Sequence, residues 1–418
     1  MLDAAENASP VRAVEAVTHE LRAALGASAV SFLISDLSGR GLVRLARRHG
    51  GDPSDEDFAV DIPFAGGPSE QAMRTQTVQV LPPEPPHGKG PAALLWTVLA
   101  PVTERGEALG LLEMSLPAEP SSLVLAEIAR IAHVLAFVVI ANRRHTDVFE
   151  VGQRSTRLTL AAEIQRRLLP ASFTCEADAF VLSAWLEPAD SIGGDTFDYS
   201  VGREDLHLSV TDAMGHGVAS ALTATLCVGS LRNARREGAS VLEQAVIANV
   251  ALVEHGRDAA DNGFATGLLG RLDLSTGILT LVNAGHVAPY LARAGTVAPV
   301  HLPVDLPLGL FRETAYRSTD LILEPGDRLV IVTDGMLERK AAARDMTAEI
   351  NKTMSLHPRE ATRRLADNVL ADSGLFLADD ALLMVLDWHG HQGRPGRDRH
   401  TVAGADPERA SNAPACSE

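Results

Sequence analysis

Two regions of the chain show different patterns of apolar and polar positions. The N-terminal pattern predicts a helix, four strands and a final helix. In order, these elements are residues 11–25, 28–34, 78–81, 92–102, 108–116 and 121–142. The last two strands bracket the polar turn 103–106, which is typical of a β-hairpin. This region therefore predicts a sheet domain that a long helix completes.

The second region combines short apolar strands with longer helices. The expected strands are residues 181–185, 206–210, 266–272, 278–282, 328–332 and 381–386. The expected helices are residues 218–236, 241–255 and 358–371. Strands that cluster before and after helices, without strict alternation, indicate an α+β fold in which helices cover sheet. Residues 389–418 are rich in Gly, Pro, Arg and Ser, and we expect them to form a disordered tail.

The stretch 206–225 joins a strand, a turn and a helix. Apolar and polar residues alternate over 206–210, which predicts a half-buried strand that ends at Asp212. Gly215 and Gly217 then allow a sharp turn before a helix rich in Ala and Leu. A carboxylate in this position can fix a cation, although a single Asp in a turn more often bonds its own backbone. Further acidic residues are needed to favour the cation site.

Composition narrows the function classes. Of the 418 residues, 46% are hydrophobic and 22% are charged, which fits a globular chain long enough for two or three domains. The formal net charge of −17 argues against nucleic acid or an anionic membrane as the main partner. An aromatic content of 4% is too low for a base-stacking platform.

Cysteine usage and the apolar runs bear on location. Cys175, Cys227 and Cys416 are scattered without metal-ligand spacing, which favours a reducing cytoplasm and excludes a cysteine-based zinc site. The N-terminus is acidic and has no hydrophobic signal core. The most apolar run, 123–140, is interrupted by charged residues and a histidine. We therefore expect a buried helix there and no membrane insertion.

Acidic residues follow several apolar strands of the second region, usually beside glycine. They are Asp195, Asp212, Asp334 and Asp379 with its neighbour Asp380. Strand ends can converge in one sheet, and clustered carboxylates repel one another unless cations neutralise them. An oxygen-only ligand set favours magnesium or manganese over zinc or copper. Two such ions about 3.5–4 Å apart can hold a hydroxide and clamp a phosphoryl group.

A series of spaced motifs in the second region matches one family in order. The motifs are GGDTFD, DAMGHG, FATG, NAGH, LPLG, PGDRLVIVTDGMLER and ADD. The upstream segment AAEIQRRLLP also matches the segment that usually precedes such a domain. Over residues 155–388 this set resembles the SpoIIE-like branch of the metal-dependent (PPM) serine/threonine phosphatases. Thr196, Phe197, Ala213, Met214 and Leu382 depart from the usual family residues, but none of these changes removes a carboxylate.

The resemblance implies a role for each acidic residue. Asp212 would bridge two divalent cations, Mn²⁺ or Mg²⁺, and the backbone carbonyl of Ala213 would be a further ligand. Asp334 and Asp379 would also be metal ligands, and Asp195 would bind directly or through water. Asp212 and Asp334 are therefore the central catalytic candidates.

Other polar residues in these motifs are secondary candidates. Asp198 and Asp380 are expected beside the metal ligands rather than among them. His216 and His286 are candidates to protonate the leaving oxygen, although a structural role suits either histidine better. His216 precedes a predicted helix, whose dipole disfavours the charged imidazole. The arginines that flank the TDG motif, Arg328 and Arg339, are not distinguished by sequence from surface arginines.

The N-terminal region, with PVTERGEALGLLE before its last helix, resembles a GAF domain over residues 10–142. GAF domains are sensory or dimerising modules, and the sequence identifies no ligand. We expect a connecting helix over 143–170 and the phosphatase domain over 171–388. This helix could carry a rotation or a register change between the two domains, and a helix that is only a spacer fits the sequence at least as well. A homodimer through the GAF-like domain and this helix is a further expectation.

These observations predict a cytoplasmic, sensor-regulated phosphatase that hydrolyses phosphoserine or phosphothreonine without a phosphoenzyme. By resemblance, the substrate would be a phosphorylated anti-sigma-factor antagonist in a partner-switching pathway. One alternative is an inactive phosphatase fold that only binds partners, which the retained carboxylates disfavour. Another is a nucleotide cyclase, suggested by GGDTF, but Thr196 stands where that family needs Glu. Ligand sensing by the GAF-like domain is compatible with the phosphatase prediction.

Overall fold

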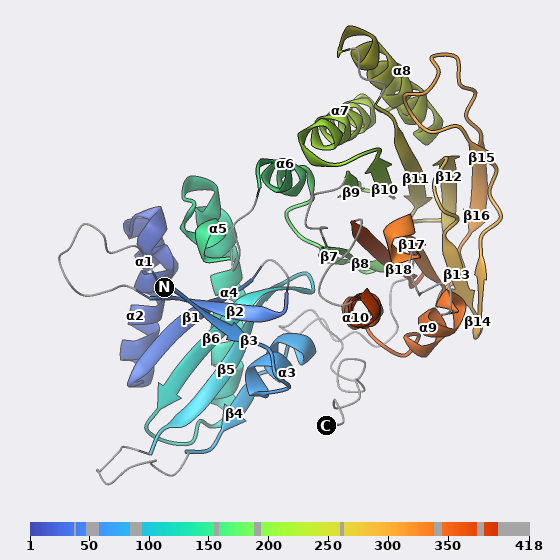
Figure 1. Ribbon diagram of the computed structural model, residues 1–418. Coiled ribbons are helices and arrows are strands. Elements are labelled where there is room, and N and C mark those ends of the chain that lie inside the picture. The colour runs from blue at the N-terminus through green and yellow to red at the C-terminus, as the bar shows by residue number, and fades with distance from the viewer. Residues whose placement is uncertain are drawn as a thin grey trace. The chain divides into compact units, whose positions relative to one another are not determined.

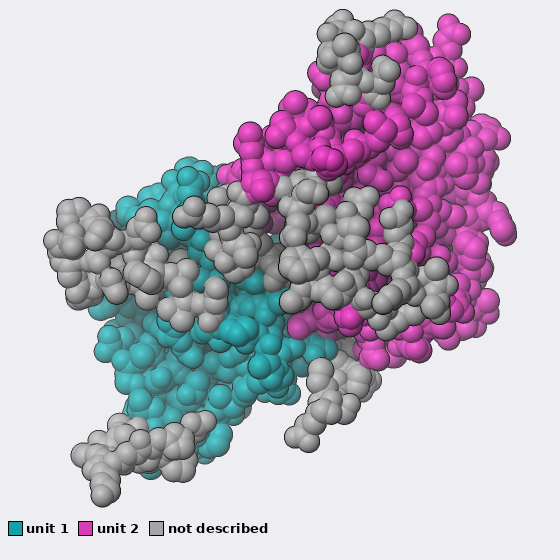
Figure 2. Space-filling view, in the orientation of Figure 1, with its two compact units in different colours: residues 1–157, 398–418 teal, residues 158–397 magenta. Residues whose placement is uncertain are grey.

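The chain folds into two compact units in the computed structural model, which divide after Arg157 (Figure 2). The structure describes residues 1–36, 39–46, 58–83, 94–153, 159–187, 194–259, 263–337, 345–373 and 380–391. Each unit has its own hydrophobic core. The two units are therefore described separately.

The first unit contains a six-stranded antiparallel sheet with the order β3-β2-β1-β6-β5-β4 (Figure 1). Its strands are β1 (Ala29–Ser35), β2 (Gly41–Ala46), β3 (Phe58–Pro63), β4 (Gln79–Leu81), β5 (Trp96–Glu104) and β6 (Glu107–Leu116). Its principal helices are α1 (Leu2–Asn7), α2 (Ala13–Leu25), α3 (Pro68–Thr75) and α4 (Ser122–Asn142). Helices α2 and α4 bury apolar side chains against one face of the sheet, and α3 covers the other face. The sequence predicted α2, α4 and four of the strands but not β2 or β3.

Helix α4 is the most apolar element of the first unit. The most apolar 18-residue window of the helical stretch Ser122–His145 has a mean hydropathy of 2.2, and by length and composition alone this stretch could cross a membrane. In the structure, 39% of its most apolar window is buried. Residues such as Ile128 and Leu135 are fully buried in the core with β5 and β6. Helix α4 therefore acts as a core helix of the first unit.

The single connecting helix expected over 143–170 is wrong. After α4 and the 3₁₀ turn Arg143–His145, Thr146 adopts an extended conformation, and its hydroxyl accepts a hydrogen bond from Val148 N that starts the short helix α5 (Val148–Gly152). Residues 154–158 lie outside the described residues. A separate helix, α6 (Leu160–Leu168), begins at Thr159, whose side chain caps Ala162 N. Capping by Thr159 favours the start of a new helix at this point over continuation of an earlier one. Helix α6 belongs to the second unit.

The second unit consists of two six-stranded sheets and the helices that cover them (Figure 1). The first sheet contains β9 (Asp195–Val201), β10 (Asp205–Ala213), β11 (Ala265–Asp273), β12 (Ile278–Ala284), β15 (Val304–Asp305) and β16 (Ser318–Ile322). The second contains β7 (Thr174–Glu176), β8 (Phe180–Glu187), β13 (Tyr290–Arg293), β14 (Thr296–Pro299), β17 (Arg328–Val332) and β18 (Ala381–Trp388). The longer helices are α7 (Gly217–Arg236), α8 (Val241–Ala259) and α10 (Pro358–Ser373), and α9 (Met346–Lys352) is shorter.

The alternation of side chains along the strands explains the layers. On β10, Leu206, Leu208 and Val210 join a core with apolar residues of β17 and β18, so the two sheets pack face to face. The outer face of the first sheet packs against α7 and α8. The outer face of the second sheet packs against α9 and α10. The predicted α+β class is therefore confirmed, with a β-sandwich between helices.

Candidate active site

Two of the predicted carboxylates, Asp195 and Asp212, lie at one end of the sandwich, on the inner face of the first sheet. Asp212 has the same parity along β10 as the core residues Leu208 and Val210, so it points between the sheets. Its direct cross-strand partner on β9 is Asp195, which is 3% exposed. Side chains opposite each other on neighbouring antiparallel strands have Cβ atoms about 5 Å apart. The fold therefore sets two carboxylates side by side where the apolar core ends.

The second sheet reaches the same place through Thr333, which follows β17. The Thr333 hydroxyl donates a hydrogen bond of 2.7 Å to Asp195 Oδ2 and accepts one of 3.0 Å from Leu382 N on β18. The neighbouring Gly335 permits a close approach, since a Cβ there would lie 1.9 Å from the backbone oxygen of Asp380. Thr333 thus holds Asp195 from across the sandwich, directly before the predicted ligand Asp334.

On the other side of Asp212, β11 links the site to His286. Thr266 is the β11 partner of Asp212, and its hydroxyl lies 3.1 Å from His286 Nδ1. The backbone around the histidine is fixed by Asn283, whose side chain accepts from His286 N and donates to His286 O. Burial lowers the pKa of His286 to about 4, against the opposing effect of a hydrogen bond with the Val332 backbone. A neutral, buried imidazole suits positioning better than proton donation.

The remaining predicted site residues differ in their surroundings. Asp334 and His216 are exposed, and His216 precedes α7 without capping it through its side chain. The Ala213 carbonyl accepts a hydrogen bond of 3.1 Å from Ser220 Oγ. Gly215 and Gly217 have φ of 93° and 77°, so the expected glycine turn is confirmed. Asp379 lies outside the described residues.

Asp198 and Arg328 form ion pairs away from the candidate site. Asp198 lies on the outer face of β9, where Arg232 and Arg235 of α7 pair with its carboxylate at 2.9 Å each. Its expected place beside the metal ligands is wrong, because residues 195 and 198 point to opposite faces of a strand. Arg328 is 1% exposed and donates two hydrogen bonds to the Asp387 carboxylate, so it is not an exposed arginine that could bind phosphate. Arg339 lies outside the described residues.

The donor chemistry of the site fits an oxygen-coordinated divalent cation. Asp195 and Asp212 present carboxylates on adjacent strands, and like charges in that position destabilise the sheet unless a cation offsets them. Among the described residues, no group of three or more His, Cys, Asp or Glu side chains is close enough to form a complete metal site. The structure therefore brings Asp195 and Asp212 together, but the described position of Asp334 does not complete a three-residue ligand group with them.

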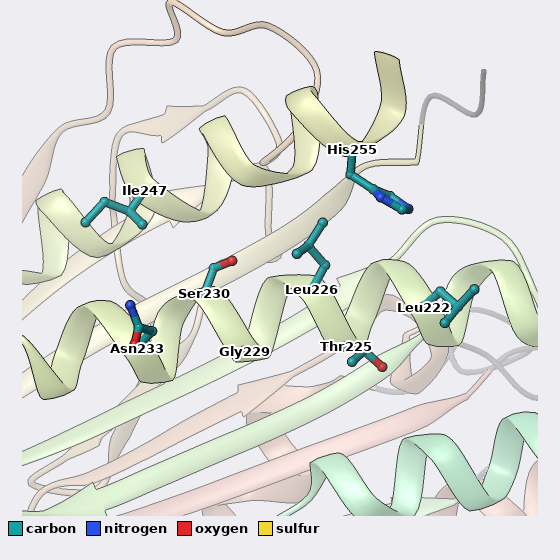
Figure 3. Close-up of a pocket in the computed structure, with 8 residues that line it drawn as sticks. All are labelled: Leu222, Thr225, Leu226, Gly229, Ser230, Asn233, Ile247 and His255. Carbon is teal, nitrogen blue, oxygen red and sulfur yellow. The ribbon is translucent and has the colours of Figure 1, made fainter. Parts of the chain in front are cut away.

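Two other features do not contribute to this site. Cys227 is fully buried, and burial raises its pKa to about 12, so it is a poor nucleophile. A groove of about 430 Å³ lies between α7 and α8 on the outside of the sandwich. Figure 3 shows its lining, with Leu222 and Leu226 from α7 and Ile247 and His255 from α8. None of these residues belongs to the strands that carry the carboxylates.

Sequence reasoning missed two residues that contact the carboxylates. Thr333 directly precedes Asp334 in the TDG motif, and this position next to a predicted metal ligand could have indicated its contact with the site. Gln165 of α6 is 3% exposed and donates hydrogen bonds of 2.7 Å to Asp195 O and to Asp380 Oδ2. It lies 30 residues before Asp195, and its spacing gives no signal of the contact.

Part of the second unit is similar in sequence to known proteins. Residues 202–389 match the sequence profile of the family described as Stage II sporulation protein E (SpoIIE). Phosphoserine phosphatase RsbU of Bacillus subtilis is 24% identical over 256 residues, which cover 59% of this chain and 75% of RsbU. Phosphoserine phosphatase RsbP of the same organism is 24% identical over 190 residues, which cover 44% of this chain and 46% of RsbP.

Solved structures overlap with the chain more loosely. The SiaA-PP2C domain of Pseudomonas aeruginosa is 19% identical, covers 54% of this chain and 93% of that one, and gives a TM-score of 0.47. The family assignment therefore depends on the sequence match and on the acidic motifs. On these grounds, the second unit contains a SpoIIE-type domain over residues 202–389, which is similar in sequence to phosphoserine phosphatases.

Proposed function

We propose that this chain is a metal-dependent protein phosphatase that hydrolyses phosphoserine or phosphothreonine esters. The observation that carries the proposal is the cross-strand pair Asp195 and Asp212 at the open end of a sandwich that belongs to a phosphatase family. Two curated relatives are named phosphoserine phosphatases, which supports this substrate class.

Asp195, Asp212 and Asp334 would hold divalent cations, Mn²⁺ or Mg²⁺, together with Asp379 and the Ala213 carbonyl. When bound, the ions would supply positive charge that stabilises the phosphoryl oxygens and activates water. The chain's own residues position this site: Thr333 orients Asp195, and Thr266 with His286 supports the strand beside Asp212. The exposed His216 is the remaining candidate to protonate the leaving oxygen.

The physiological substrate in this proposal is a phosphorylated anti-sigma-factor antagonist in a partner-switching pathway, by analogy with the RsbU and RsbP relatives. The first unit is proposed to be a GAF-like sensory domain, which its six-stranded antiparallel sheet and flanking helices support. A cytoplasmic location and a homodimer through this unit stay predictions, and the sequence identifies no ligand for this unit.

The test is hydrolysis of a generic phosphate ester and a phosphoserine peptide by the full chain with Mn²⁺ or EDTA. We expect Mn²⁺-dependent turnover that falls by about 1,000-fold or more in Asp212→Ala and Asp334→Ala, because loss of a metal ligand removes several kcal/mol of transition-state stabilisation. Asp205→Asn is the control, since Asp205 lies at the opposite end of β10, paired with Arg271. Absence of turnover with any metal, while the chain still binds a partner, would favour the inactive scaffold.

A further inference from the structure

Helix α6 reaches the candidate metal site through one side chain. The helix lies beside α7 (Figure 1) and packs Ala161 and Ala162 against Ala221 of that helix. Gln165, one turn further along, points instead into the end of the sandwich, where it is 3% exposed. A buried side-chain amide requires hydrogen-bond partners, and here both described partners belong to the site.

Both contacts of Gln165 involve the acidic motifs. Its Nε2 donates a hydrogen bond of 2.7 Å to the backbone oxygen of Asp195 and another of 2.7 Å to Asp380 Oδ2. One amide group thereby connects β9 of the first sheet with the residue before β18 of the second sheet. These are the strands that Thr333 also joins, by its bonds to Asp195 and Leu382.

A second contact holds α6 in register with β9. Arg232 of α7 donates a hydrogen bond of 2.6 Å to Leu168 O, at the end of α6, and also pairs with Asp198 on β9. Helix α6 is therefore fixed to β9 at two points, Gln165 with Asp195 and Arg232 with Asp198. A rotation or shift of α6 would remove both Gln165 bonds, because one helical residue turns the side chain by about 100°.

We propose that Gln165 is a positioning residue of the phosphatase reaction, which aligns Asp195 and Asp380 so that the candidate metal site can bind its cations. This role rests on the proposed function. It goes beyond that function because it gives α6, which lies outside the strands that carry the candidate ligands, an influence on metal affinity. Gln165 acts through Asp195 and Asp380 and does not touch substrate. Outer residues that orient metal ligands typically change metal affinity by about 10–100-fold when they are replaced.

The experiment measures Mn²⁺ binding by the full chain without substrate, as the Mn²⁺ concentration at half saturation in a direct calorimetric titration. Gln165→Met keeps the side-chain volume and removes the donors, and Gln165→Glu places a carboxylate against Asp380. We expect the half-maximal Mn²⁺ concentration to rise by about 10-fold or more in Gln165→Met and further in Gln165→Glu. Saturating Mn²⁺ should restore most of the turnover of Gln165→Met.

The matched control is Gln244→Met. Gln244 is also a buried helical glutamine of the second unit, 6% exposed, but its amide donates to Ala239 O and not to the site. We expect its Mn²⁺ midpoint to equal that of the wild type. Equal shifts in Gln165→Met and Gln244→Met would overturn the positioning role. If Gln165→Met does not fold, Gln165→Glu, which has the same shape as the native residue, provides the comparison.

The two proposals fail in different ways. Wild-type protein that binds Mn²⁺ but hydrolyses no phosphate ester would overturn the proposed function alone, because the midpoint comparison needs no turnover. Active wild-type protein whose Mn²⁺ midpoint is unchanged in both Gln165 variants would overturn the role of Gln165 alone.

Discussion

Two buried polar clusters in the second unit balance their charges differently. On the outer face of the second sheet, Arg328 pairs with Asp387 at 2.6 Å, and His357 lies 2.8 Å from Glu176. At the end of the sandwich, two carboxylates face each other across adjacent strands. The first cluster places a basic side chain beside each carboxylate, whereas in the second cluster Thr333 and Gln165 donate neutral hydrogen bonds to Asp195 and Asp380.

The difference separates a structural cluster from a functional one. The buried Arg328 donates hydrogen bonds to the Asp387 carboxylate and to the Thr353 and Leu356 carbonyls, so this cluster requires no ion from solution to neutralise it. Adjacent carboxylates destabilise the empty fold and become favourable when a cation is added. The charge-matched cluster should therefore control stability, and the carboxylate cluster should control the response to metal.

The largest expected effect comes from breaking the charge-matched cluster. Arg328→Met leaves the buried Asp387 without its arginine, and we expect the free energy of unfolding of the second unit to fall by about 3–5 kcal/mol. The measurement is chemical denaturation, monitored through hydrogen exchange of the backbone amides of β17 and β18. Arg271→Met is the control, because Arg271 is an exposed partner of Asp205 and should cost at most about 1 kcal/mol. Equal losses in the two variants would contradict the comparison.

The pH dependence of stability should reveal the buried histidine at the carboxylate cluster. His286 has a pKa of about 4 in the folded state, below its ordinary value, so the unfolded chain takes up the proton first as pH falls. The contribution of neutral His286 to the free energy of unfolding is fully present above pH about 6.5. About 3 kcal/mol of this free energy is lost as pH falls toward about 4.

Denaturation of the wild type and of His286→Gln across this pH range checks the expectation. The wild type should lose more stability on acidification than the variant does. Burial also lowers the pKa of His357, opposed by its hydrogen bond to Glu176, so this histidine contributes equally to both proteins and cancels in the difference. Parallel stability curves for the two proteins would contradict the assignment of this acid sensitivity to His286.

The smallest effect is also the most specific for the carboxylate pair. Asp195→Asn removes one of two facing charges but keeps an oxygen that can accept from Thr333. In EDTA we expect the variant to be more stable than the wild type by about 0.5–1 kcal/mol, and in Mn²⁺ to gain less stability. Thermal unfolding with and without metal measures both quantities.

The matched control is on the same strand. Asp198→Asn removes a charge that Arg232 and Arg235 neutralise, so this variant should be less stable than the wild type in EDTA. Stabilisation by both substitutions, or by neither, would mean that the two faces of β9 do not differ in charge balance as the structure indicates.

Much of the fold was predictable because it depends on local periodicity. The strands around Leu206–Val210 and Arg328–Val332 and the helices that begin near Gly217 and Val241 appear where the patterns place them. The alternation along β10 predicts which face each side chain occupies as well as the strand itself. It places Asp212 on the same face as Leu208 and Val210. The prediction of one connecting helix was wrong because the extended backbone at Thr146 and the helix cap at Thr159 interrupt a pattern that apolar spacing alone made continuous.

The sequence by itself determined the acidic residue types, their order and their places at strand ends, because these depend on neighbours along the chain. Only the tertiary structure decided which of them meet. Strand pairing brought Asp195 opposite Asp212, the parity of β9 turned Asp198 toward the arginines of α7, and the packing of α6 carried Gln165 to both sheets. These contacts join residues far apart in sequence, and they depend on pairing register and helix packing, which no local pattern encodes.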